Sequence, residues 1–236
     1  MLNNLRVLLV WALVLCLPMQ AAAFPSTSVL DTFNRADEDP LSGGGNWAGP
    51  ILSGLNQMKV VSNGIMQSLV VASQSGTSYW NAATFGPGSE VYFDVTTVWA
   101  NNASDVWTWC NGQNENSGSV DGYAMVAGRS TGSWVWVLYR LDNGAWTKLG
   151  ADLATQLLSA GDGVGIECGT SGIFQTYYKA SGGSWTTLGT TRTDTTYTSG
   201  HIGFSKGYLD STSVVDNFGG GNMSTLKRFL LLGVGQ

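Results

Sequence analysis

The sequence predicts an all-β protein whose antiparallel strands pack as a sandwich or a barrel. Glycine accounts for 32 of 236 residues, charged residues for only 11%, and Thr, Ser, Trp and Tyr are frequent. This bias is typical of short strands joined by glycine-rich turns. About a dozen strand-like runs follow one another with Gly, Asn and Asp between them, and no helical pattern separates them. Strands without intervening helices favour antiparallel pairing.

The expected strands alternate apolar and polar residues or are rich in β-branched and aromatic residues. They cover residues 28–33, 58–62, 65–72, 78–85, 89–99, 105–110, 121–128, 133–141, 145–150, 163–168, 173–179, 185–189, 201–206 and 213–220. Two segments echo each other, "YRLDNGAWTKLG" at 139–150 and "YKASGGSWTTLG" at 178–189. Each has a glycine turn between an aromatic residue and a Trp-Thr pair, so each is expected to be a β-hairpin.

The first 23 residues have the order of a secretory signal peptide. Arg6 precedes an apolar run from Val7 to Leu17, and the small residues Ala21 to Ala23 follow. The alternative is a membrane anchor, but that run would cover only about 16 Å as a helix, roughly half of a bilayer core. We therefore expect cleavage near Ala23, a secreted or cell-surface protein, and no stable membrane span after the signal is removed.

Cleavage would leave Cys110 and Cys168 as the cysteines of the mature chain. Two cysteines in an exported protein suggest a disulfide, and both end strand-like runs in which they share a face with small apolar residues. Two buried thiols are the alternative at this point. A structural zinc site is not expected, because two cysteines and the single His201 fall short of four ligands.

The charge balance favours a neutral partner. The chain has 16 acidic and 11 basic residues, without long runs of either sign. Nucleic acid and anionic membranes would be repelled rather than attracted. A polysaccharide or another neutral glycan fits this surface better.

Several motifs spread over the mature chain carry a family resemblance. They are "LDTFNRADEDPLSGGGNW", "YWNAATFGPGSEVYFDV", "DGYAM", "YRLDNGAWTKLG", "RTDTTYTSGHIGF" and "VVDNFGGG". Together they resemble the concanavalin A-like lectin/glucanase (LamG-like jelly-roll) superfamily. We accordingly expect a signal peptide at 1–23, one jelly-roll domain at 24–221 and a flexible apolar tail at 222–236. Because lectins, binding modules, glucanases, lyases and structural domains share this fold, the resemblance indicates fold more than function.

The resemblance implies an antiparallel two-sheet β-sandwich with one concave and one convex sheet and with the first and last strands adjacent. Phe33 and Phe218 would then seal one end of the core. It also implies a structural calcium ion near the joined ends, held by Asp216 with help from Asp31 or Asp37, since calcium takes hard oxygen ligands. The alternative for Asp216 is a turn cap or a hydrogen bond to Arg35. No cofactor is required.

The enzymes of this superfamily suggest two catalytic arrangements, and neither matches well. Glucanases need two carboxylates about 5 to 9.5 Å apart, whereas Glu90 and Asp94 on one strand would be separated by roughly 13 Å. Lyases suggest Tyr177, Lys179 and His201, but "GHIGF" departs from the family's pattern around the histidine and the arginine-bearing strand is missing. A polysaccharide-degrading lyase or glucanase is therefore the third functional hypothesis.

The tryptophans offer a binding surface instead. If the valine and cysteine faces of the strands form the core, alternation directs Trp107, Trp109, Trp134, Trp136 and Glu167 outward onto the concave sheet. With Tyr123 and Arg140 they form the candidate carbohydrate-binding site, because indole rings stack on the flat faces of sugars while polar groups fix the hydroxyls. Burial of these rings in the core is the alternative. Trp146 and Trp185, which follow hairpin turns, are interpreted as structural plugs.

The sequence thus favours a secreted, lectin-like domain that binds a glycan without cleaving it. The second hypothesis is a structural or adhesive domain of an extracellular particle, filament or phage-type assembly, whose concave face packs against protein. The oligomeric state is not predicted.

Overall fold

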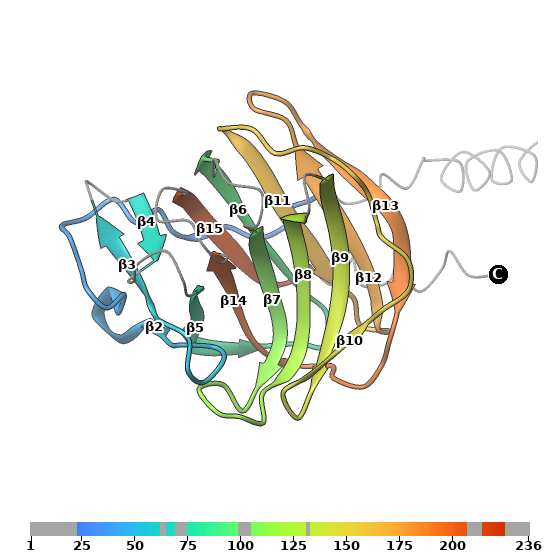
Figure 1. The fold of residues 1–236 in the computed structure, drawn as a ribbon, viewed down its shortest axis with the longest axis horizontal. Coiled ribbons are helices and arrows are strands. Elements are labelled where there is room, and N and C mark those ends of the chain that lie inside the picture. The colour runs from blue at the N-terminus through green and yellow to red at the C-terminus, as the bar shows by residue number, and fades with distance from the viewer. Residues whose placement is uncertain are drawn as a thin grey trace, which may run out of the picture.

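The computed structural model describes residues 23–61, 65–68, 75–98, 105–130, 133–206 and 214–224. These residues form fifteen strands and a single 3-10 turn, η1 (Gly43–Gly45), which confirms the all-β prediction. The strands build two antiparallel sheets that lie one behind the other (Figure 1). No helix in the described part of the chain is long and apolar enough to cross a membrane.

The first sheet, sheet A, has eight strands, of which β1 pairs with β15 beside the main path β13-β12-β11-β6-β15-β4-β3. Its strands are β1 (Val29–Asp31), β3 (Met58–Val61), β4 (Ile65–Ser68), β6 (Ser89–Thr97), β11 (Asp162–Cys168), β12 (Ile173–Lys179), β13 (Trp185–Thr193) and β15 (Val214–Asn222).

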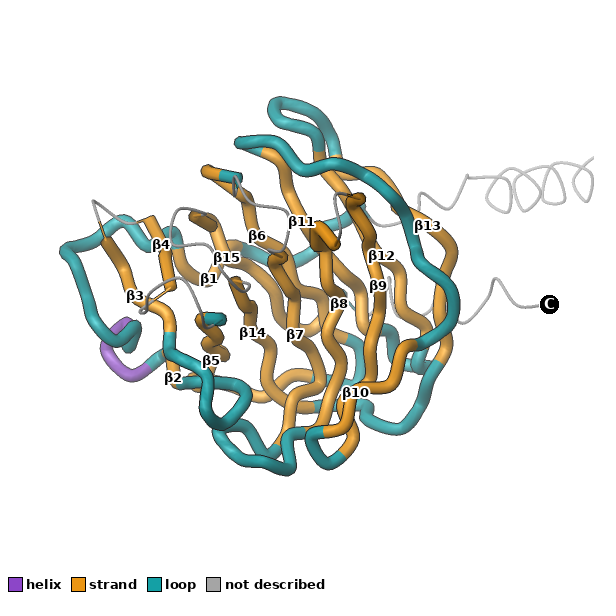
Figure 2. The backbone as a smooth tube through the Cα atoms, viewed as in Figure 1, coloured by secondary structure: helices purple, strands orange, loops and turns teal. Residues whose placement is uncertain are grey.

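The second sheet, sheet B, has seven strands in the order β10-β9-β8-β7-β14-β5-β2. They are β2 (Trp47–Ala48), β5 (Gly76–Phe85), β7 (Asp105–Gln113), β8 (Asp121–Ser130), β9 (Ser133–Asp142), β10 (Ala145–Lys148) and β14 (Gly200–Lys206). Figure 2 shows the strands of the two sheets and the loops that join them. The two-sheet sandwich predicted from the sequence is confirmed.

The first and last strands, β1 and β15, are adjacent as predicted. In the pairing of β1 with β15, Val29 lies opposite Gly219 and Asp31 opposite Phe218. Phe33 and Phe218 are fully buried and pack with Trp47 and Phe204 in one aromatic group at this end of the core. The first and last strands therefore close the sandwich with ring-to-ring packing.

Both predicted hairpins are present. Strands β9 and β10 pair across the turn Asn143-Gly144, where both residues have positive φ (50° and 78°), the backbone that a tight hairpin turn requires. Strands β12 and β13 pair in the same way from Lys179 and Trp185 onward.

A disulfide joins the sheets. Cys110 at the inner face of β7 bonds to Cys168 of β11, which confirms the predicted bridge and excludes two free thiols. It lies in the main core, in the same cluster as Tyr123 and Phe174. The outer faces of β7 and β11 are thereby held at opposite sides of the sandwich.

The segment before β1 lies against the outer face of sheet A. Phe24 is buried, and a Cβ built at Gly165 of β11 would fall 2.4 Å from its ring. The predicted signal peptide and most of the predicted tail, residues 1–22 and 225–236, lie outside the described residues. Both segments stay predictions.

Candidate functional site

Strand β7 presents the tryptophans that the sequence singled out. Val106 and Cys110 belong to the main core, so alternation turns Asp105, Trp107 and Trp109 to the outer face of sheet B. The predicted orientation of Trp107 and Trp109 is therefore confirmed. Their exposure differs, because Trp107 is half-buried whereas Trp109 is only 2% exposed.

Trp109 is sealed by a second small apolar cluster on this outer face. The cluster contains Ile51, Trp109, Val120, Ala124 and Leu141. Glycine makes room for the indole, since a Cβ at Gly112 would fall 2.0 Å from its Nε1. Trp109 thus supports the outer face from beneath and offers no ring to a ligand.

The predicted placement of Trp134 and Trp136 is wrong. Both are buried in the core between the sheets, and Trp136 donates a hydrogen bond from Nε1 to the Gln156 carbonyl at 2.8 Å. The reason is the register with β8, in which Ala127 lies opposite Trp136 and leaves space for the indole. The valines of β9, Val135 and Val137, take the outer face instead.

Tyr123 and Arg140 also face inward, at the rim of the core. The Tyr123 hydroxyl and the Arg140 guanidinium donate to the two oxygens of Asp194, each at 2.7 Å. These groups tie β8 and β9 to the loop after β13. They are not on the outer face of sheet B, so the predicted site that included them is corrected.

Glu167 lies on the outer face of the other sheet, contrary to the expectation that it would join the tryptophans. In the pairing of β11 with β6 it stands directly opposite Glu90. Sequence reasoning missed this carboxylate pair, because only the strand register brings the two residues together. Both side chains are buried.

The segment before β1 covers the Glu90 and Glu167 pair. Glu90 accepts hydrogen bonds from the backbone N–H and the hydroxyl of both Ser26 and Thr27. The hydroxyl of Tyr177 bonds to Glu167. A carboxylate surrounded by donors from its own chain is a structural anchor, and no open surface reaches this pair.

The residues considered for a lyase do not converge. Tyr177 and Lys179 stand on the outer face of sheet A, where Lys179 pairs with Asp94 at 2.7 Å. His201 lies on sheet B, with its Nδ1 at 3.2 Å from the carboxylate of Glu115 and its ring 5.0 Å from that of Tyr79. Because the two groups lie on different sheets, they cannot act on one sugar carbon.

A pocket opens on the outer face of sheet B, beside Trp107. Its volume is about 480 Å³, within the range usual for small-ligand sites. We call it the aromatic pocket and define it by the residues that line it: Leu52, Leu55, Ser75, Asp105, Trp107, Val126, Tyr139 and Trp146.

Three rings form the aromatic side of this pocket. Trp107 and Trp146 meet edge to face with 5.1 Å between ring centroids and 77° between planes, and Tyr139 meets Trp146 at 5.3 Å and 82°. Trp146 comes from β10, which the hairpin turn folds back beside β9. It is 40% exposed, so its interpretation as a structural plug is wrong.

The polar side of the pocket is the Asp105 carboxyl. Its Oδ1 is buried without a hydrogen-bond partner, as is Nε1 of Trp107. Burial raises the pKa of Asp105 to about 7, and the nearby indole N–H of Trp107 lowers it only in part. A carboxyl in this state can exchange a proton near neutral pH and can accept a hydrogen bond from a ligand.

The sequence contains local signals for this pocket. The "DNG" turn predicted that Trp146 folds back beside β9, where alternation places Tyr139 opposite in face to Trp136. Asp105 precedes Trp107 by two residues and therefore shares its face. The prediction failed because it assigned the wrong face of β9 to the core.

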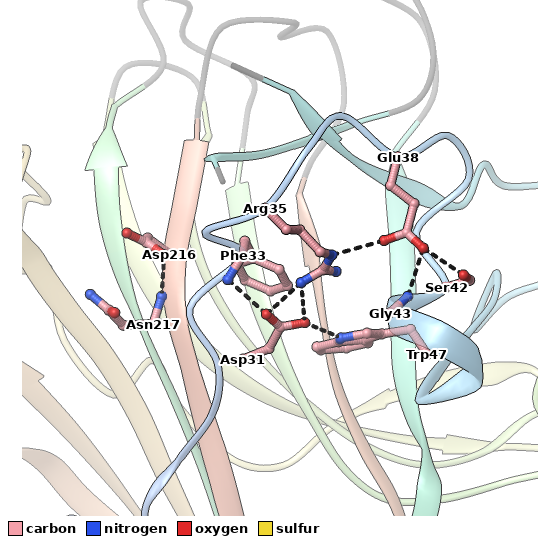
Figure 3. Close-up of polar contacts among 9 residues, drawn as sticks. All are labelled: Asp31, Phe33, Arg35, Glu38, Ser42, Gly43, Trp47, Asp216 and Asn217. Carbon is pink, nitrogen blue, oxygen red and sulfur yellow. Dashed lines mark hydrogen bonds and ion pairs between the residues drawn. The ribbon is translucent and has the colours of Figure 1, made fainter. Parts of the chain in front are cut away.

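The residues proposed for calcium form a different arrangement, shown in Figure 3. Both oxygens of Asp31 accept hydrogen bonds from Arg35, at 2.7 and 2.9 Å, and one also accepts from Trp47 Nε1 at 2.7 Å. Asp216 instead accepts from the backbone N–H of Asn217. A guanidinium already neutralises Asp31, so as arranged these two carboxylates do not fit a shared calcium site.

Within the described ranges, no group of three or more His, Cys, Asp or Glu side chains could hold a metal ion. Asp37, the third residue considered for calcium, does not belong to any such group.

No protein-family model matches the chain, and no curated protein matches it in sequence. Solved structures do resemble it. The exoplasmic/lumenal domain of VIP36 in its Ca²⁺/Man2-bound form aligns with a TM-score of 0.57 at 12% identity, over 85% of this chain and 88% of that one. The carbohydrate recognition domain of Emp47p aligns at 0.53 and 10%, over 87% and 99%.

A third similar structure is a legume lectin-like domain from Entamoeba histolytica, with a TM-score of 0.54 at 8% identity over 79% of this chain and 96% of that one. Identities this low establish a common fold and nothing finer.

Proposed function

Because this chain has the concanavalin A-like jelly-roll fold, we propose that it binds a glycan, without cleaving it, in the aromatic pocket of sheet B. The observation that carries the proposal is the set of three rings, Trp107, Tyr139 and Trp146, around a pocket of about 480 Å³. This function keeps the predicted ligand class and moves the site from Trp109, Trp134 and Trp136 to the neighbouring rings.

The chemistry of the pocket suits a sugar. The C–H groups on a sugar face pack against indole, and a few polar groups then select the hydroxyls. Trp146 leaves a large apolar surface in water, which a ligand would cover at a gain of about 1.5 to 3 kcal/mol for a fully buried ring. The pocket therefore has both an apolar platform and, in Asp105, a polar group to orient the ligand.

The scaffold holds these rings in place before a ligand arrives. Trp107 and Val126 pair between β7 and β8, and Tyr139 lies opposite Ala124 in the next pair of strands. Residues fixed by strand register lose little further freedom on binding. Two proteins of similar fold support the proposal by analogy. The VIP36 domain is in its Ca²⁺/Man2-bound form, and the Emp47p domain is a carbohydrate recognition domain.

We also propose that the protein is exported and that residues 1–23 are removed. The Cys110–Cys168 disulfide supports an oxidising compartment. Amino-terminal sequencing of the exported protein should begin at Phe24. The proposed function requires no metal ion, and a structural calcium bound elsewhere would be compatible with it.

The test is a glycan array followed by calorimetric titration of the best ligand. Trp146→Ala should weaken binding about tenfold or more, since it removes the most exposed ring of the pocket. The matched control is Trp185→Ala, which changes the corresponding tryptophan of the second hairpin on the outer face of sheet A. Equal losses in the two variants would show that the aromatic pocket is not the site.

The structural or adhesive hypothesis predicts different results. The array would be silent, and sedimentation would show assembly that depends on protein concentration and on Trp146. Release of reducing sugar, or of an unsaturated uronate, would instead support the polysaccharide-degrading hypothesis.

A further inference from the structure

The aromatic pocket contains a carboxyl oxygen, Oδ1 of Asp105, that is buried without a hydrogen-bond partner. Two other acidic side chains with little exposure are supplied with donors. Glu90 accepts from Ser26 and Thr27, and Asp194 accepts from Tyr123 and Arg140. By contrast, Oδ1 of Asp105 has no partner although it is buried. An unmet buried acceptor is destabilising, and more so when it is charged, so its retention at a pocket wall points to a ligand.

The surroundings of Asp105 favour a cation as that ligand group. Trp107, Tyr139 and Trp146 line the same pocket, with neighbouring rings nearly perpendicular. The negative faces of aromatic rings attract ammonium groups. An ammonium carries only hydrogen-bond donors, which matches an acceptor that lacks one.

The described charges near the pocket do not oppose a cation. Asp105 is the charged side chain among the lining residues. Lys148, which lies opposite Tyr139 on β10, already pairs with Asp152 at 2.6 Å. The whole chain carries a formal net charge of -5.

We propose that the aromatic pocket selects ligands with a free ammonium group, held against the rings of Trp107, Tyr139 and Trp146 with Asp105 as its counter-ion. This inference rests on the proposed function and names its ligand class, a glycan whose amino sugars are not acetylated. A quaternary ammonium such as choline could supply the positive charge and the contacts with the rings, but it has no N–H to donate to Asp105, and the experiment separates the two sources.

Three oligosaccharide probes of equal length separate charge from shape: β-1,4-linked glucosamine, N-acetylglucosamine and glucose. The expected result at pH 6.5 and low salt is an affinity for the glucosamine probe at least about tenfold above that for either neutral probe. Choline chloride is titrated in parallel. Competition by choline at similar concentrations would assign the selectivity to the ammonium alone, and its failure to compete would assign it to an amino sugar.

Two variants test the role of the carboxyl. Asp105→Asn keeps the shape of the side chain and removes its charge, so the preference for glucosamine should fall to about twofold or less while the fold is kept. Asp39→Asn is the control, because it removes one exposed carboxylate of the same sign that is not among the pocket residues. It should leave the preference unchanged.

The outcomes keep this inference distinct from the proposed function. If all three oligosaccharides bind alike and Trp146→Ala abolishes binding, glycan binding stands and the ammonium inference is overturned. If Asp39→Asn reduces the preference as much as Asp105→Asn, the selectivity comes from net charge and the inference is also overturned. If no glycan binds but choline does so through Asp105, the proposed function fails and the ammonium site stands.

Discussion

The ring of Phe24 stacks on the ring of Tyr177, with 3.9 Å between their centroids and 2° between their planes. Trp185 meets Phe24 edge-on at 5.0 Å, and Tyr92 does so at 6.1 Å. Gly165 lies beneath the Phe24 ring, and any side chain at that position would clash with the ring. The Phe24 ring and its aromatic neighbours therefore hold the segment before β1 against the outer face of sheet A.

We expect Phe24→Ala to lower the free energy of unfolding by about 3 to 5 kcal/mol, the range for deleting a buried phenylalanine ring. Urea titration followed by tryptophan fluorescence measures this change. Val29→Ala, at an exposed position of the adjoining strand, should cost less than about 1 kcal/mol. Similar losses in the two variants would mean that the packing of Phe24 makes no specific contribution to the free energy of unfolding.

Arg35 carries a second structural prediction. Its guanidinium bonds both to Asp31 and to Glu38, and the Asp31 carboxylate is largely buried. Arg35→Met should reduce the free energy of unfolding by about 2 kcal/mol, because Asp31 loses its charged partner. Lys148→Met breaks the exposed Lys148–Asp152 pair and should cost less than about 0.5 kcal/mol.

Calcium provides a check on the same site. Adding calcium should not restore the stability of Arg35→Met if the guanidinium is the cation that Asp31 is built to hold. Recovery of the lost melting temperature by millimolar calcium would show that this corner of the fold binds the ion after all.

The sequence predicted which face of β7 and of β11 packs into the core, but it did not predict this for β9, and the reason is physical. In β7 and β11 one face is small and β-branched, so the core side of Val106, Cys110 and Ile166 could be identified. Both faces of β9 carry large apolar residues, and alternation alone cannot choose between them. The choice was made by Ala127 on the neighbouring strand, which has room for Trp136.

The sequence pattern also did not predict which distant strands pair with each other. Glu90 and Glu167 are 77 residues apart along the chain and become neighbours only because β6 pairs with β11. Local turn signals predicted the hairpin that carries Trp146, yet they gave no indication that its ring would line a pocket with Asp105. Turn chemistry is local, whereas a pocket depends on which strands lie side by side.

Removal of the disulfide should lower the free energy of unfolding of the sandwich without unfolding it. Cys110 and Cys168 are 58 residues apart, and closing a loop of that length restricts the unfolded chain by about 4 kcal/mol in the entropic model. We expect Cys110→Ala/Cys168→Ala to lose roughly 2 to 4 kcal/mol in urea titrations. Dithiothreitol should destabilise the native protein by a similar amount and leave the double variant unchanged.

Asp105 makes stability depend on pH in an unusual direction. Its pKa is raised from 3.8 to about 7 in the folded state, chiefly by burial, so between these values the folded protein binds a proton that the unfolded chain has released. The free energy of unfolding should therefore fall as pH rises from about 4 to 7, by at most about 1.4 kcal/mol per pH unit and roughly 4 kcal/mol in all. Above pH 7 this contribution is lost and the dependence flattens.

Asp105→Asn isolates this effect. The variant should lack the decline between pH 4 and 7 and should exceed the native protein in stability at pH 8, because no charge is then buried in the pocket. The comparison is made by urea titration at four pH values, with Asp152→Asn as the exposed control. If the two variants follow the same pH profile, the Asp105 carboxyl is solvated and is not held in the pocket as an unpaired acid.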